Sequence, residues 1–258
     1  MPAISYSAAL VPVRADFAAA HTRFWRRLAA PGTWWTGAER VAMAAEVRHA
    51  RYCALCQTRQ ATLARLRRRR ASSPFTPAAV QGHHDHLGAL PDAAVDVIHR
   101  VVTDPGRLSR SWFQETLAAG LTPEQYVEII GTLVALVSID SFCRGLGVPL
   151  HPLPEPQPGA PSQYRPPGAI QEEAWVPMIP VERATGAEAD LYGGQAVGNV
   201  VRALSLVPDE VRTLYDVSAA HYLPMGQVRD PSAATGALNR MQMELIAGRV
   251  SALRQCFY

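Results

Sequence analysis

The sequence lacks any uninterrupted apolar run long enough to span a lipid bilayer, which takes about 20 residues in a helix. Its most apolar stretch, residues 126–139, is too short and is interrupted by Glu128 and Gly131. The N-terminal segment MPAISYSAAL has no positive charge ahead of an apolar core, so it does not match a signal peptide. We therefore expect a cytoplasmic protein with no membrane partner.

Charge of either sign is also scarce. Charged residues make up 18% of the chain, and the formal net charge is only +3. Much of the basic excess lies in residues 65–70, so there is no extended basic surface of the kind that nucleic acids bind. No nucleic-acid partner is expected. Because 48% of the residues are hydrophobic, the chain can bury a substantial core.

Alternation of apolar and polar residues is absent, so β-strands are not expected. Two segments have the spacing of a helix capping box, with Thr36 three residues before Glu39 and Thr122 three residues before Gln125. The sequence therefore predicts an all-α fold. The expected helices cover residues 16–28, 36 to about 70, 91–102, 108–119, 122 to about 145, 186–206, 208–221 and 239–258.

Proline is concentrated in residues 149–168, PLHPLPEPQPGAPSQYRPPG. So many prolines prevent a helix and favour a semi-rigid linker. This segment predicts a domain over residues 1–150, a linker over 151–170 and a second domain over 171–258.

Cysteine is rare, with four residues in the whole chain, and cytoplasmic thiols stay reduced. Cys53 and Cys56 are nevertheless separated by only two residues, a spacing that allows a disulfide within one helical turn. At a helix N-terminus the dipole would lower the pKa of such a thiol. Glu39 and Glu46 lie upstream and are candidate bases for the thiol proton. Glu39 also occupies the capping-box position, which is a sufficient role on its own.

Residues 241–258 carry a second pattern, in which Cys256 follows Glu244 by twelve residues (244 to 256) across an apolar Leu-Ile-Ala run. This segment resembles the signature helix of the alkylhydroperoxidase D-like (carboxymuconolactone decarboxylase-like) family. In that family the glutamate precedes a Cys-x-x-Cys-x-x-x-His motif, and Glu244 and Cys256 match the glutamate and the first cysteine.

The first half of the chain resembles the same motif less closely. Glu39 precedes Cys53 by fourteen residues rather than twelve (39 to 53), and both cysteines of the motif are present. Gln60 stands where the family has its histidine. The two motifs together indicate an internal repeat.

The resemblance implies an alkylhydroperoxidase D-like helical fold with one full copy and a partial second copy. It also implies peroxidase activity, in which Cys56 attacks a hydroperoxide, Cys53 resolves the product and Glu39 accepts the proton. Glu244 and Cys256 would play the corresponding parts in the second copy.

The resemblance further implies the partners of the protein. They are a hydroperoxide substrate, a dithiol reductant protein and further copies of the chain in a homo-oligomer. Relatives of the selenoprotein type carry selenocysteine at the position that would follow Tyr258, so a selenocysteine encoded by a recoded stop codon is expected there. The alternatives are a frameshift or a decayed second domain. No other cofactor and no metal ion is expected from the resemblance.

Two interpretations from other functional classes remain open. Cys53 and Cys56 could bind zinc together with histidines of the segment His83–His86, although the spacing is not that of a zinc finger. Alternatively, the absence of a histidine at Gln60 favours a non-catalytic helical scaffold or binding protein.

Overall fold

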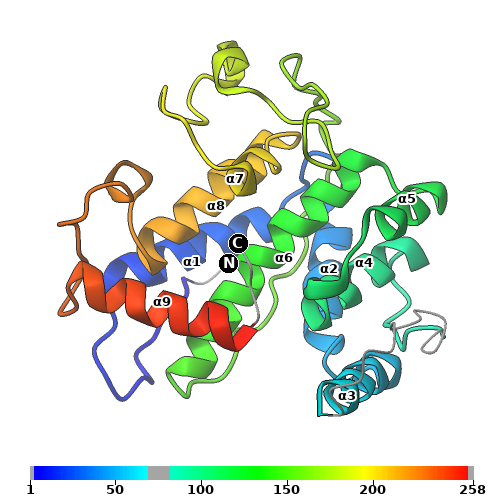
Figure 1. Cartoon of the computed structure of the whole chain (residues 1–258), viewed down its shortest axis with the longest axis horizontal. Coiled ribbons are helices and arrows are strands. Elements are labelled where there is room, and N and C mark those ends of the chain that lie inside the picture. The colour runs from blue at the N-terminus through cyan, green and yellow to red at the C-terminus, as the bar shows by residue number, and fades with distance from the viewer. Residues whose placement is uncertain (1–2, 69–81, 255–258) are drawn as a thin grey trace.

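A computed structural model of the chain describes residues 3–68 and 82–254. The described residues form an all-α fold, as predicted, and their β-pairing is limited to an isolated bridge between Ile170 and Met178 (Figure 1). The α-helices are α1 (Ala15–Ala29), α2 (Gly37–His49), α3 (Ala54–Arg68), α4 (Asp92–Thr103), α5 (Arg110–Ala118), α6 (Pro123–Gly145), α7 (Asn199–Arg202), α8 (Pro208–His221) and α9 (Arg240–Arg254).

Both predicted capping boxes are present. The Thr36 hydroxyl accepts a hydrogen bond from the Glu39 backbone N–H, and the Glu39 carboxylate accepts one from the Thr36 N–H at 2.8 Å. Thr122 and Gln125 make the same reciprocal pair at the start of α6. These local interactions explain why α2 and α6 begin where the sequence predicts.

The central element is α6, which runs through the middle of the molecule between α8 on one side and α2 and α4 on the other (Figure 1). It is long and apolar enough to cross a membrane by length and composition, but 61% of its most apolar window is buried within the protein. Its hydropathy is therefore that of a core helix. It extends beyond residues 126–139 because the capping box sets its start, and Gly147, with φ of 69°, closes the turn after its end.

Two predicted helices differ from the structure. The helix expected from residue 36 to about 70 is interrupted, because a turn closed by a hydrogen bond from the Tyr52 N–H to the His49 carbonyl separates α2 from α3. Residues 186–206 are mostly irregular, and α7 is only four residues long. Gly193 and Gly194, with φ of 56° and 70°, adopt the left-handed conformation that a helix cannot accommodate.

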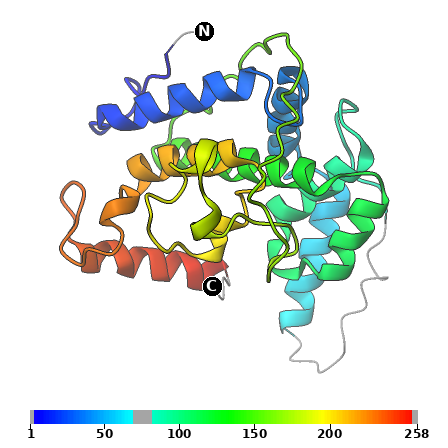
Figure 2. The same ribbon diagram turned by 90° about the horizontal axis from the view of Figure 1, so that it is seen from above.

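The proline-rich segment is irregular, as predicted, but it is not a free linker. Its backbone hydrogen-bonds to the connection between α1 and α2, from the Gln157 N–H to the Ala29 carbonyl at 2.7 Å and from the Gln163 N–H to the Thr33 carbonyl at 2.7 Å. Farther along the chain, α8 packs against both α1 and α6, and Figure 2 shows it between α1 and α9. The predicted boundary at 151–170 is thus a change in secondary structure within a shared hydrophobic core.

A buried ion cluster also joins these parts. Arg40 of α2 binds Glu128 of α6 and Glu210 of α8, and all three side chains are at most 4% exposed. The Glu128 carboxylate accepts a further hydrogen bond from the Trp34 N–H at 2.6 Å. Because unpaired charge is costly in a core, this cluster fixes the positions of three helices relative to one another.

Candidate functional site

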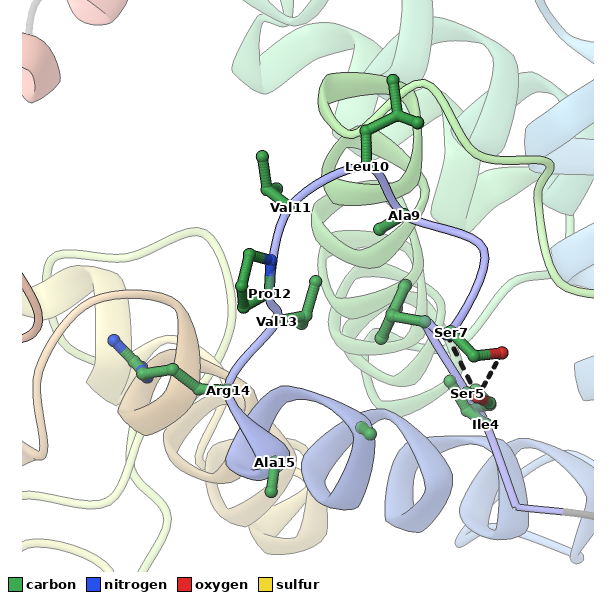
Figure 3. A pocket seen from close by; sticks show the side chains of 12 residues that line it. Ile4, Ser5, Ser7, Ala9, Leu10, Val11, Pro12, Val13, Arg14 and Ala15 are labelled. Carbon is green, nitrogen blue, oxygen red and sulfur yellow. Dashed lines mark hydrogen bonds between the residues drawn. The ribbon is translucent and has the colours of Figure 1, made fainter.

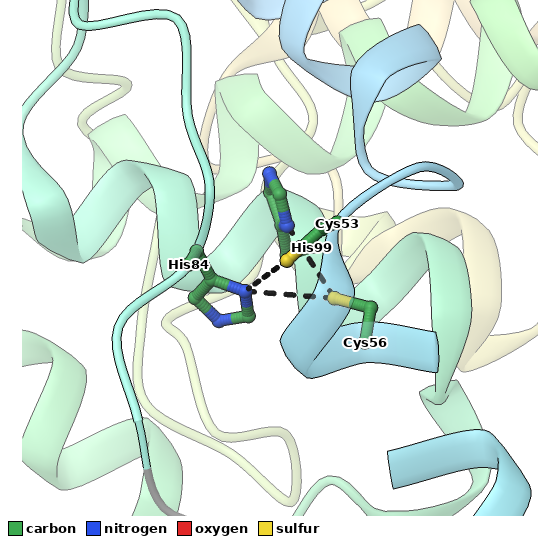
Figure 4. A group of neighbouring side chains, drawn as sticks. All are labelled: Cys53, Cys56, His84 and His99. Carbon is green, nitrogen blue, oxygen red and sulfur yellow. Dashed lines mark hydrogen bonds between the residues drawn. The ribbon is translucent and has the colours of Figure 1, made fainter. Parts of the chain in front are cut away.

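Four side chains converge at the N-terminal end of α3: Cys53, Cys56, His84 and His99 (Figure 4). Their sulfur and nitrogen atoms all lie within 4.8 Å of one another. His84 Nδ1 is 3.6 Å from the Cys53 Sγ and 3.5 Å from the Cys56 Sγ. His99 Nδ1 is 3.4 Å from the Cys56 Sγ. We call this group the Cys–His cluster.

Local structure explains how the two thiols come together. Cys53 lies at the entrance of α3, where its carbonyl accepts the Gln57 N–H at 3.0 Å, and Cys56 lies in the first turn. The turn after α2 is therefore needed, because it places the pair at a helix N-terminus rather than in a helix interior. The Ala54 N–H donates to the Asp85 carboxylate at 2.8 Å, which attaches the loop carrying His84 to the same helix end.

Each histidine is held by a carboxylate through its outer nitrogen. His99 Nε2 lies 2.7 Å from Glu46 of α2, whose second oxygen accepts the Leu87 N–H at 3.0 Å. His84 Nε2 lies 3.0 Å from Asp96 of α4, which also accepts a hydrogen bond from the indole of Trp112 at 2.6 Å. Both imidazoles consequently present Nδ1 to the thiols.

The electrostatics of the cluster favour the thiolate form of Cys53. Burial alone would raise the pKa of Cys53, but hydrogen bonds from the Cys56 backbone, the His84 ring and the Asp85 backbone outweigh burial and lower it. Burial would lower the pKa of His84, yet its bonds to Asp96 and to both thiols raise that pKa to about 10. For His99, burial prevails over the attraction of Glu46 and lowers the pKa.

The cluster is closed to solvent except on the side of His84. Cys53, Cys56 and His99 are at most 1% exposed. A cavity of about 280 Å³ is lined by His84 and Asp96 together with the exposed residues His83 and His86. A larger hollow of about 550 Å³ is lined by residues 4–7, 9–15 and 18 and includes none of the cluster (Figure 3).

The structure brings Cys53 and Cys56 together but leaves Glu39 at the opposite end of α2. There the Glu39 carboxylate bonds to the Thr36 N–H and hydroxyl, so capping is the role that the structure shows for it. Glu46, nearer the end of α2, occupies the position beside the cluster. Gln60 is exposed and donates to the Thr103 carbonyl at 3.0 Å.

Glu244, the described residue of the predicted C-terminal motif, is not part of this site. Glu244 is exposed and bonds to the hydroxyl of Tyr222 and to Arg240, the latter at 2.6 Å. Cys256 lies outside the described residues. Of the segment His83–His86, His84 alone among its three histidines joins the Cys–His cluster.

Sequence reasoning missed His99 and Asp96. The helix 92–103 is amphipathic, and His99 lies on its buried face with Val95 and Ile98. A histidine on the apolar face of a short helix is a usable signal, because a buried imidazole needs polar partners. The identity of those partners depended on contacts between distant segments.

Comparison with protein-family models, with characterised proteins and with solved structures finds no match to this chain.

Proposed function

We propose that Cys53 and Cys56 form a redox-active dithiol that reduces a hydroperoxide, the activity implied by the resemblance to the alkylhydroperoxidase D-like family. The observation that carries the proposal is a continuous chain from thiol to carboxylate: Cys56 Sγ to His99 Nδ1 at 3.4 Å, and His99 Nε2 to Glu46 at 2.7 Å. A nucleophile, a base and a group that orients the base are the parts that activated thiols require.

In this proposal, each group of the Cys56–His99–Glu46 series has its own role. Burial keeps the pKa of His99 low, so the ring is neutral near pH 7 and can accept the Cys56 proton at Nδ1. Glu46 then stabilises the imidazolium through Nε2. This arrangement replaces the role expected of Glu39, and it requires no histidine at Gln60.

The reaction balances with one hydroperoxide and two thiols. The Cys56 thiolate attacks the outer peroxide oxygen, an S–O bond forms, the O–O bond breaks and the departing alkoxide takes a proton from His99. Cys53 then attacks the sulfenic sulfur, so that an S–S bond forms and water leaves. Two electrons from an external dithiol restore both thiols.

The cavity beside His84 supports access to this centre. Its lining includes three histidines and two aspartates, and it ends at a ring that contacts both sulfurs. A small hydroperoxide fits its volume of about 280 Å³. The substrate class favoured by such a lining is a small polar peroxide.

The test is the count of free thiols in reduced, metal-free protein after one equivalent of hydrogen peroxide. We expect two thiols to be lost and to return with a dithiol reductant. Cys56→Ser should abolish the loss, whereas Cys53→Ser should stop at a sulfenic acid that dimedone traps.

Cys143 provides the matched control, because it is a buried thiol in α6 outside the cluster. Cys143→Ser should react as the unmodified chain does. Equal reactivity of Cys56→Ser and the unmodified chain would contradict the proposal.

A further inference from the structure

The redox chemistry proposed above leaves much of the cluster unused. It needs one histidine and one carboxylate, whereas the structure places a second pair, His84 and Asp96, against the same sulfurs. In this second pair, as in the first, a carboxylate lies within hydrogen-bond distance of the outer nitrogen of the ring, here at 3.0 Å. With this pair, two sulfur atoms and two ring nitrogens face one another, an arrangement that fits a single ligand in contact with all four.

The geometry points to a zinc site with Cys53, Cys56, His84 and His99 as its ligands. Zinc binds cysteine sulfur at about 2.3 Å and histidine nitrogen at about 2.0–2.1 Å, so a tetrahedral site separates sulfur from nitrogen by about 3.5 Å. Three of the four sulfur–nitrogen pairs in the cluster lie at 3.4, 3.5 and 3.6 Å, and all four ligand atoms lie within 4.8 Å of one another. Figure 4 shows the His84 ring directed at both sulfurs and the contact of His99 with the Cys56 sulfur.

The outer hydrogen bonds match those of protein zinc sites. A zinc-binding histidine donates its other N–H to a carboxylate or carbonyl, which fixes the tautomer and the ring orientation. His99 and His84 both do so, to Glu46 at 2.7 Å and to Asp96 at 3.0 Å. Each carboxylate is in turn held by a second donor, the Leu87 N–H and the Trp112 indole respectively.

The ligand atoms and their burial indicate which metal ion would bind and whether the site is structural or catalytic. Two thiolates with two imidazoles suit zinc, whereas calcium and magnesium prefer oxygen ligands. Two thiolates also balance the charge of Zn²⁺, so the occupied centre is neutral, as a buried site requires. Four protein ligands leave no open position, which indicates a structural rather than a catalytic zinc ion.

A zinc ion here would connect three separate segments of the chain. Cys53 and Cys56 belong to the start of α3, His84 to the loop before α4, and His99 to α4 itself. Among the described helices, α3 packs mainly against α4. The metal would therefore hold α3 and the loop onto the rest of the fold.

This inference does not depend on the peroxide reaction, although the same sulfurs serve both. A disulfide between Cys53 and Cys56 has no thiolate to offer, so the zinc-bound and oxidised forms exclude one another. Zinc binding is tested without peroxide and the peroxide reaction without metal, so each idea can fail alone.

The experiment loads the reduced, metal-free full chain with zinc and measures metal content and affinity against a chromophoric chelator. We expect one zinc ion per chain and release of the thiol protons on binding. Cobalt(II) in place of zinc should give thiolate charge-transfer and intense tetrahedral d–d absorption, a readout that needs no variant.

Variants then identify the ligands. His84→Ala should weaken zinc binding at least tenfold, and Asp96→Asn should weaken it about 10–100-fold through loss of the outer hydrogen bond. His83→Ala is the matched control, because His83 is the exposed neighbour of His84, and its affinity should not change. Absence of tetrahedral cobalt absorption in the unmodified chain, or equal losses in His83→Ala and His84→Ala, would overturn the inference.

Discussion

The two parts of the chain that carry a glutamate–cysteine pattern differ in what surrounds them. Around Cys53 and Cys56, polar groups from α2, α4 and the loop before α4 form a connected hydrogen-bond network. Glu244 in α9 instead faces solvent, and the apolar side chains of the same helix, Met241 and Leu245, are 79% and 74% exposed.

The difference shows that a matching spacing of residues within one segment is not sufficient to form a site. The C-terminal pattern was the closer match to the alkylhydroperoxidase D-like motif, yet within the described residues it gathers only Tyr222 and Arg240. The N-terminal pattern matched less well, but distant segments bring His84 and His99 to it. A reactive or metal-binding site forms where side chains from separate elements come together.

The largest effect should come from the buried charges that fix α2 against α6 and α8. Arg40→Met leaves Glu128 and Glu210 without their cation in the core, which should reduce the free energy of unfolding by about 3–5 kcal/mol. Urea denaturation followed by circular dichroism measures this change. An unchanged midpoint would show that the three helices do not depend on the cluster, and Arg110→Met on the exposed surface serves as control.

A smaller loss should follow from weakening the support of the Cys–His cluster itself. Glu46→Gln keeps the shape of the side chain but puts an amide where His99 and the Leu87 N–H both need an acceptor. We expect a loss of about 1–3 kcal/mol, together with slower loss of thiols to peroxide. If stability and thiol reactivity both stay as in the unmodified chain, Glu46 neither orients His99 nor holds the loop.

The fold could be predicted from the sequence where interactions between neighbouring residues determine it. Thr36 and Thr122 begin their helices through contacts three residues away, and those helix starts were predicted correctly. The helix expected over 186–206 was wrong, because Gly193 and Gly194 adopt backbone angles that apolar periodicity does not reveal.

The candidate site was accessible only in part for the same reason. The Cys53–Cys56 pair is local and could be found, whereas His84 and His99 lie 28 and 43 residues from Cys56. Glu39 and Glu46 sit on one helix, and only its packing against α4 shows which of them faces the thiols. Contacts of this range follow from the tertiary fold and not from spacing.

The contact between α1 and α8, which lies outside both glutamate–cysteine patterns, should make the stability of the protein depend on pH. His21 and His221 hydrogen-bond through their Nε2 atoms at 2.6 Å. Burial and the neighbouring His221 and His151 lower the pKa of His21 to about 3, and burial lowers that of His221. Between about pH 6.5 and pH 3 the unfolded chain therefore binds more protons than the folded chain, so this pair makes stability fall as the pH drops through that window.

The measurement is the urea midpoint at pH 7 and at pH 4.5. His21→Gln removes one of the two titrating rings, so its midpoint should fall less between the two pH values than that of the unmodified chain. An equal fall in both proteins would mean that other groups account for the acid sensitivity.

The smallest effect should come from changing Glu244, which was a candidate only because it matches the family motif. Glu244→Gln removes a charge that pairs with Arg240 at the protein surface, where solvent screens the interaction. The melting temperature and the rate of thiol loss to peroxide should both match the unmodified chain, whereas Glu46→Gln changes both. A loss of peroxide reactivity in Glu244→Gln would reverse the comparison, because it would mean that α9 contributes to a reactive site despite its exposure.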